Sequence, residues 1–211
     1  MSKVKIVGAI ALVAGLFFII ATYVWTQNKP VDSTVIDSAQ LQPTQSVSMG
    51  PEDAKVTIVE FFDPACEACR AFYPFVKQLM ADNPQDVRLV LRYAAFHQGS
   101  EEVVRMLEAA RIQKVFKPVL EALLETQPKW ASHGSPQLSI AWQAAKEAGL
   151  DTNLANLSLR SDLVNKVVER DAADVKALGV QKTPTFYVNG RSLPSFGAQQ
   201  LKDLVEQELK K

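Results

Sequence analysis

Residues 56–70 read VTIVEFFDPACEACR, a short β-rich run that stops at Asp63-Pro64 and leads into a Cys-x-x-C pair. Beyond Cys69, apolar residues recur every three to four positions as far as Met80, which predicts a helix packed on a sheet. Val87–Tyr93 follows with the alternating pattern of a second strand. A strand, a helix and a strand in about forty residues predict a right-handed βαβ unit.

The rest of the chain adds a block of helices and then two more strands. Helical periodicity runs through residues 100–178 and suggests four helices, at 101–112, 114–126, 136–148 and 160–178. Residues 183–190 then form a predicted strand that ends in an Asn-Gly hairpin turn, with residues 191–193 as its partner and a closing amphipathic helix after it. The order βαβ, helices, ββα predicts an α/β protein.

The two cysteines of the chain, Cys66 and Cys69, carry the predicted chemistry. A disulfide between them would close almost no loop, so it would stabilise the fold little, and the further sulfur ligands of a four-cysteine zinc site are absent from the sequence. A Cys-x-x-C beside a βαβ unit indicates a thioredoxin-like redox motif. At the start of a helix Cys66 would be an exposed thiolate nucleophile, and the more buried Cys69 would resolve the mixed disulfide.

Glu60 and Thr183-Pro184 are further candidate site residues. Glu60 is a carboxylate in an otherwise apolar strand, where it either relays the proton of Cys69 with a raised pKa or faces solvent at the strand edge, and the pattern favours neither. Pro184 either starts a strand in the ordinary way or follows a cis peptide bond that orients the backbone toward the disulfide and accepts an extended substrate.

An apolar run near the N-terminus predicts a membrane anchor. Residues 6–25 contain no charge and form a helix about 30 Å long, the thickness of a hydrocarbon core. Positive charges in residues 1–5 favour a cytoplasmic N-terminus, and a cleaved signal peptide is the alternative. Residues 26–51 are predicted to be a flexible tether, or to include a short added strand near Gln45–Ser48, and residues 52–211 to be the folded domain.

Composition and charge exclude some classes of protein. Hydrophobic residues make up 47% and charged residues 22%, as in a globular protein, and the zero formal charge argues against a nucleic-acid binder. Two histidines are present: His97 is interpreted as a surface-loop residue, with a position near the rim of the site as the alternative, and neither it nor His133 suggests a metal site. Trp130 and Trp142 are expected to pack within the helical block.

Residues 59–70, VEFFDPACEACR, together with residues 182–190, KTPTFYVNG, resemble the DsbA family of exported thiol–disulfide oxidoreductases. The resemblance implies a thioredoxin fold with an inserted helical domain at about 100–178, a redox-active Cys66–Cys69 disulfide and no other cofactor. It also implies a cis Pro184 after Thr183 and a buried acid at Glu60.

The dipeptide between the cysteines departs from the family pattern. The strongest oxidants of the family resemble Cys-Pro-His-Cys, whereas this chain has Glu67-Ala68. A carboxylate beside Cys66 is expected to raise the thiol pKa, with Arg70 offsetting part of the effect, and to bring the redox potential nearer to that of thioredoxin.

The expected function is therefore dithiol–disulfide exchange on cysteines of exported proteins. The expected protein is a monomer, anchored once in a bacterial inner membrane with its catalytic domain in the periplasm or another extracytoplasmic space, and recycled by a redox partner that the sequence does not name. The alternatives are a disulfide reductase or isomerase, a Cu(I)-binding metallochaperone that uses the same thiols, and a binding module whose redox pair is incidental.

Overall fold

The computed structural model describes residues 18, 22, 35–132 and 134–211. Its five strands form one sheet in the order β1-β3-β2-β4-β5. The strands are β1 (Val47–Met49), β2 (Val56–Phe62), β3 (Val87–Tyr93), β4 (Thr185–Val188) and β5 (Arg191–Ser192). The central strand β2 is parallel to β3 and antiparallel to β4. The βαβ half and the ββα half predicted from the sequence are therefore joined by the pairing of β2 with β4.

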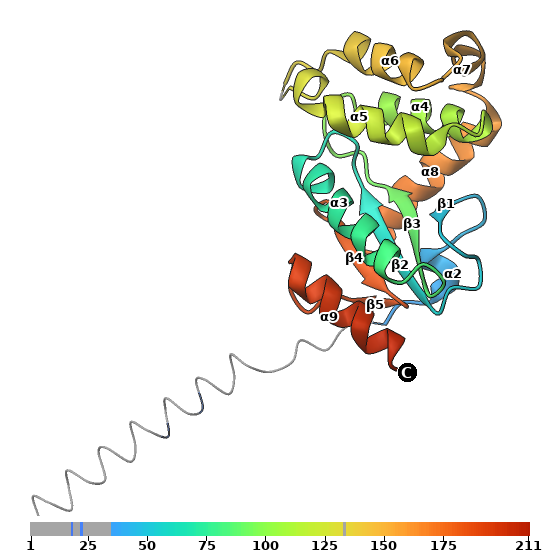
Figure 1. Ribbon diagram of the computed structural model, residues 1–211. Coiled ribbons are helices and arrows are strands. Elements are labelled where there is room, and N and C mark those ends of the chain that lie inside the picture. The colour runs from blue at the N-terminus through green and yellow to red at the C-terminus, as the bar shows by residue number, and fades with distance from the viewer. Residues whose placement is uncertain (1–17, 19–21, 23–34, 133) are drawn as a thin grey trace, which may run out of the picture. The chain divides into compact units, whose positions relative to one another are not determined.

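The sheet is covered on both faces, which explains why every residue of β2 is buried. The helices are α2 (Ser38–Leu41), α3 (Glu67–Asp82), α4 (Ser100–Ile112), α5 (Phe116–Trp130), α6 (Leu138–Glu147), α7 (Thr152–Ser158), α8 (Asp162–Ala177) and α9 (Ala198–Leu209). Alternate side chains of β2 enter two apolar clusters: Ile58 and Phe62 pack with α3 and α9, and Phe61 packs with the end of α8. Figure 1 shows the sheet between these layers.

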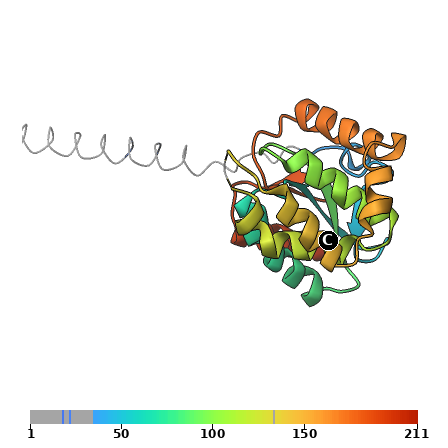
Figure 2. The same ribbon diagram turned by 90° about the horizontal axis from the view of Figure 1, so that it is seen from above.

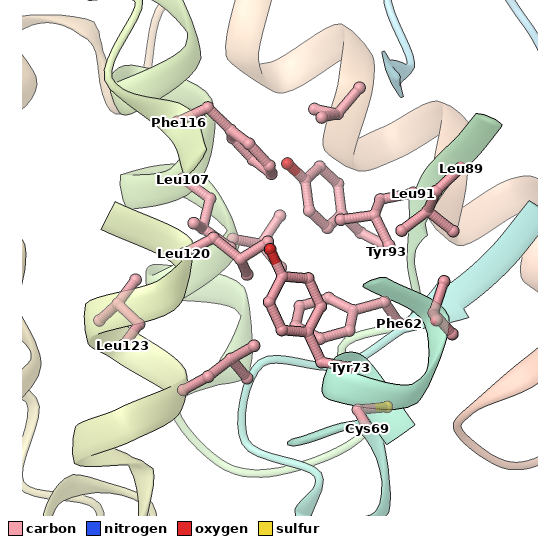
Figure 3. Packing of buried hydrophobic residues seen from close by; sticks show 14 of the residues in the cluster. Phe62, Cys69, Tyr73, Leu89, Leu91, Tyr93, Leu107, Phe116, Leu120 and Leu123 are labelled. Carbon is pink, nitrogen blue, oxygen red and sulfur yellow. The ribbon is translucent and has the colours of Figure 1, made fainter. Parts of the chain in front are cut away.

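Helices α4 to α8 form a helical block between β3 and β4 in the sequence, as predicted. Figure 1 shows that α4 to α7 lie across one end of the sheet and that α8 runs from them onto one face of it; Figure 2 gives the view from above. Its apolar side chains, among them Leu107 of α4 and Phe116 and Leu120 of α5, meet Tyr73 of α3 and Tyr93 of β3 in the largest buried cluster (Figure 3). The block and the start of α3 therefore share one core.

The limits of all four predicted helices of the block differ in the structure: by one residue at the start of α4, by two at the start and one at the end of α6, and by more in α5, with α8 shorter at both ends. The helix predicted over 114–126 extends to Trp130, which is fully buried and donates a hydrogen bond from Nε1 to the Leu123 carbonyl at 2.8 Å. This packing outweighs Pro128, which lies in the last turn of the helix. The helix predicted over 160–178 starts at Asp162, because Ser161 caps it by accepting a hydrogen bond from Val164 N.

The N-terminal part of the folded domain begins earlier than predicted. The expected tether over residues 26–51 contains α2 and β1, and β1 pairs with β3, close to the short added strand that the sequence offered as the alternative near Gln45–Ser48. Residues from 35 onward therefore belong to the domain. Leu41 is fully buried, and the guanidinium of Arg92 donates hydrogen bonds to the carbonyls of Gln40 and Leu41 at 3.0 and 3.1 Å. A buried cation needs such acceptors, and a sequence pattern does not reveal them.

The predicted anchor over residues 6–25 lies outside the described residues, apart from positions 18 and 22. Among the residues that the structure describes, no helix combines the length and the apolar character needed to cross a membrane.

Candidate active site

Cys66 and Cys69 lie at the start of α3, where the sequence predicts them. Cys66 is the N-cap residue, and Cys69 is in the first turn. Both thiols are free, so this is the dithiol form. Cys69 is fully buried, as expected, but Cys66 was predicted to be exposed and is only 6% exposed. The cause is the segment before β4, since the Cys66 thiol donates a hydrogen bond to the Thr183 carbonyl at 3.3 Å.

The environment of Cys66 favours its thiolate. A hydrogen bond from the Cys69 side chain is the largest cause that lowers the pKa of Cys66 to about 5, and burial of the sulfur opposes it. Smaller contributions come from the backbone N–H groups of Cys69 and Ala68. These N–H groups belong to the first turn of α3, where they have no partner within the helix. The predicted helix-terminus effect is therefore present.

Glu60 is buried with Cys69 rather than at the solvent edge of the sheet. It is 1% exposed, and neither carboxylate oxygen has a hydrogen-bond partner in the structure. Burial raises the pKa of Glu60 to about 8, with a further increase from the charge of Cys66. Burial also raises the pKa of Cys69, to which its hydrogen bond with Cys66 and the charge of Glu60 add. Glu60 therefore holds a proton at neutral pH, available to the Cys69 sulfur when the disulfide is reduced.

The Thr183–Pro184 peptide bond is cis, as the family resemblance implies. It precedes β4, whose Phe186 pairs with Glu60 on β2, so strand pairing brings the segment to the cysteines. Beside Pro184 is a groove with a largely apolar wall that includes Phe186, Leu193 and Phe196. Phe196 is 49% exposed and stacks on Phe72 of α3 at 4.8 Å between ring centroids.

A cluster around Asp63 adjoins the cysteines and was not predicted from the sequence, which indicated only a strand end there. Asp63 is fully buried directly after β2, and its carboxylate contacts Nδ1 of His97 at 2.7 Å. His97, interpreted from the sequence as a surface-loop residue, therefore lies at the site with 34% of its side chain exposed. Its position just after β3, at the same sheet end as Cys66, is the only sequence signal that points to it.

Gln127 of α5 is a second residue that the sequence does not single out. It is 1% exposed, and its Nε2 donates hydrogen bonds to the carbonyls of Pro64 and Cys66 at 2.8 and 3.0 Å. Its Oε1 accepts a hydrogen bond from Nε of Arg70 at 2.9 Å. Gln127 therefore connects the helical block to both sides of the loop that presents Cys66.

The residues between the cysteines act differently from the expectation. Glu67 is not among the largest causes of the Cys66 pKa shift; its charge instead contributes to raising the pKa of His97. Ala68 acts through its backbone N–H. Arg70, expected to offset Glu67, is engaged by Gln127.

Comparisons with known proteins agree with this arrangement. A family model described as Thioredoxin matches residues 42–207. Disulfide bond formation protein D of Bacillus subtilis (strain 168) is 29% identical over 176 residues, which cover 77% of this chain and 76% of that protein. The crystal structure of oxidised BdbD from Bacillus subtilis superposes with a TM-score of 0.70 and 26% identity, covering 85% of this chain and 100% of the other.

A second relative is much longer than this chain and is named as an antiporter rather than as a disulfide bond formation protein. The Na(+)/H(+) antiporter NhaA of Herminiimonas arsenicoxydans is 33% identical over 182 residues, which cover 86% of this chain but only 28% of the antiporter. Because the chain spans so small a part of that relative, we carry over no transport activity from its name.

The fold and the paired thiols at the start of α3 define a thioredoxin-fold thiol–disulfide oxidoreductase. The chain belongs to the thioredoxin family, and its relatives confirm the predicted membership of the DsbA-like group.

Proposed function

We propose that this protein oxidises pairs of cysteines in exported proteins through Cys66 and Cys69. The observation that carries the proposal is the lowered pKa of Cys66, about 5, beside a fully buried Cys69. A stabilised thiolate favours the dithiol form, so the disulfide form accepts electrons readily. The Cys66 value lies between about 7 for thioredoxin and about 3.5 for DsbA. We therefore expect a potential between those of these two proteins, more oxidising than Glu67 alone would suggest.

The exchange balances in electrons and protons. A client thiolate attacks Cys66 Sγ, a mixed disulfide forms, and the Cys66–Cys69 bond breaks. The Cys69 sulfur leaves and takes the proton of Glu60, whose raised pKa makes it a proton donor near neutral pH. The second client thiolate then attacks the client sulfur of the mixed disulfide and releases Cys66 as a thiolate. The client loses two electrons and two protons: the protein disulfide gains the electrons, one proton replaces the one that Glu60 gave to Cys69, and the other passes to solvent.

The groove beside Pro184 supports a role in client binding. Its apolar wall, with Phe186 and the half-exposed Phe196, suits an extended client segment with apolar side chains around the cysteine. Thr183 and Pro184 would form the end of the groove that faces Cys66. The thiol contact with the Thr183 carbonyl supports this assignment.

The location and partners belong to the same proposal. The uncharged run of residues 6–25 supports a single membrane anchor, with the thiol domain as a monomer in the periplasm or another extracytoplasmic space of a bacterium. A redox partner with its own disulfide would return Cys66 and Cys69 to the oxidised form. Alkaline extraction of membranes and protease protection of the thiol domain test this part.

The decisive experiment mixes the oxidised full-length protein with a reduced peptide that contains two cysteines. We expect the peptide to form its disulfide while the protein becomes a dithiol, and Cys66→Ser to abolish the reaction. Equilibration with glutathione gives the potential, and a value as negative as that of thioredoxin would favour a reductase. Tight Cu(I) binding without turnover would favour the metallochaperone; among the described residues, no group of three or more metal-binding side chains gathers.

A further inference from the structure

Asp63 and His97 form a charged pair beside Cys66 that the exchange reaction described above does not use. One oxygen of Asp63 accepts hydrogen bonds from Ala65 N at 2.8 Å and from the Ser100 hydroxyl. The other accepts from the backbone N–H groups of Phe96 and His97 at 2.7 and 3.0 Å and contacts His97 Nδ1 at 2.7 Å. With this many donors the carboxylate is fixed, and the imidazole ring is fixed with it.

The geometry assigns the proton positions on His97. A carboxylate only accepts hydrogen bonds, so the short contact with Asp63 requires a proton on Nδ1. The second, titrating proton therefore binds and leaves at Nε2. With 34% of the His97 side chain exposed, the ring exchanges protons with solvent while Asp63 holds it in place.

Among the described residues, the charges that raise the pKa of His97 belong to Asp63 at the end of β2 and to Cys66 and Glu67 at the start of α3. Glu101, in the first turn of α4, is paired with Arg105 at 2.9 Å. Partial burial lowers the pKa of His97, but the hydrogen bond and charge of Asp63 and the charges of Cys66 and Glu67 together raise it.

An interaction between two ionisable groups acts equally on both. If the Cys66 thiolate makes His97 easier to protonate, protonated His97 makes Cys66 easier to ionise by the same free energy. We propose that His97, held by Asp63, is a positioning residue whose protonated ring stabilises the Cys66 thiolate. This proposal deepens the proposed function and rests on it: a histidine outside the Cys-x-x-C loop makes the oxidising strength of the disulfide depend on pH.

The direction of the pH dependence follows from the charge on His97. Below its raised pKa the ring is positive, the thiolate is favoured and the disulfide is more oxidising. Above that pKa the ring is neutral and this contribution disappears. Glu60, which faces Cys66 from β2, contributes in the same direction, because it also becomes more negative as the pH rises.

The test measures the alkylation rate of Cys66 by iodoacetamide in the reduced full-length protein from pH 4 to 9. Cys69 does not interfere, because it is fully buried and burial raises its pKa. In His97→Gln we expect the rate at pH 5 to fall about two- to fivefold, the effect of an upward shift of about half to one pKa unit on a thiol whose pKa is about 5. His97→Lys keeps a positive charge and should stay within about twofold of the wild type.

Ser100→Ala is the matched control. It removes a hydrogen bond to the same Asp63 carboxylate from the same region of the chain, but it changes no charge. We expect its pH profile to match the wild type even if its stability falls. Equal profiles for His97→Gln and the wild type would overturn the proposal, and so would a shift in Ser100→Ala as large as that in His97→Gln.

A second measurement needs no variant. Alkylation of Cys66 removes its negative charge, so the pKa of His97, followed by NMR of the imidazole ring, should fall in the alkylated protein. An unchanged His97 titration would contradict the coupling. Both measurements are independent of turnover. A wild type that fails to oxidise the dithiol peptide but shows the coupling would therefore refute the proposed function and leave the interaction between His97 and Cys66 established.

Discussion

The ionisation of Glu60 and the ionisation of Cys66 change the free energy of unfolding in opposite directions as the pH rises. Burial raises the pKa of Glu60 from 4.5 to about 8, so between these values the folded protein keeps a proton that the unfolded chain releases, and stability falls as pH rises. The pKa of Cys66 is lowered from 9.0 to about 5, so the folded dithiol has lost a proton that the unfolded chain retains. Its contribution to stability therefore rises with pH across that window.

In the reduced wild type, the ionisation of Cys66 largely cancels the fall in stability with pH that Glu60 causes. We predict that Cys66→Ser removes this cancellation. Urea unfolding at pH 5, 6.5 and 8 should show a free energy of unfolding that falls with pH, by at most about 1.4 kcal/mol per pH unit from this group. The double variant Cys66→Ser/Glu60→Gln is the control and should lose this part of the slope. The same slope in both variants would show that Glu60 is already ionised in the folded protein.

At the scale of helices and loops, Gln127 is the contact that joins α5 to the Cys66 loop. We predict that Gln127→Leu lowers the free energy of unfolding by about 1–3 kcal/mol, because the Pro64 carbonyl and Arg70 lose their buried partner. Urea denaturation measures the change. Gln143→Leu is the control, since Gln143 makes an exposed hydrogen bond to Glu147 and should change stability by less than about 0.5 kcal/mol. Equal effects of the two substitutions would exclude the proposed role of Gln127.

Local patterns were sufficient to predict the elements that carry the thiols. The two parallel strands were predicted with the bounds they have, because alternating apolar runs between clear breakers leave few alternatives. Asp63 and Gln127 were missed, and His97 was interpreted as a surface-loop residue rather than one at the rim of the site, for one physical reason. Each acts through partners 30 or more residues away in the sequence, and a single polar residue in a loop or an amphipathic helix has no pattern that reveals such a partner.

At the scale of the whole domain, Arg92 connects three parts of the chain. It is fully buried on β3, forms an ion pair with Asp171 of α8 at 2.9 Å, and donates to the carbonyls of Gln40 and Leu41 ahead of β1. The sequence shows only a charge in an alternating strand. The buried position explains why residues after 34, predicted to be a tether, are part of the fold.

We predict that Arg92→Leu destabilises the domain by about 3–5 kcal/mol, because buried acceptors lose their cation. Hydrogen exchange should show that the backbone amides of β1 lose protection early, because the hydrogen bonds from Arg92 to the carbonyls of Gln40 and Leu41 are lost. Lys202→Leu removes an exposed pairing with Glu206 at 3.8 Å and should change stability by less than about 1 kcal/mol. Unchanged protection of β1 in Arg92→Leu would show that strand pairing alone holds the segment.

The order of strands in the sheet has a consequence for biosynthesis. Cys66 and Cys69 follow β2, whereas the Thr183 segment that covers Cys66 precedes β4, more than a hundred residues later. Both cysteines are therefore synthesised well before the Thr183 segment that covers Cys66. Until the residues around Thr183 have been made, the nascent chain carries a Cys66 thiol without that cover, available to any oxidant that the chain meets.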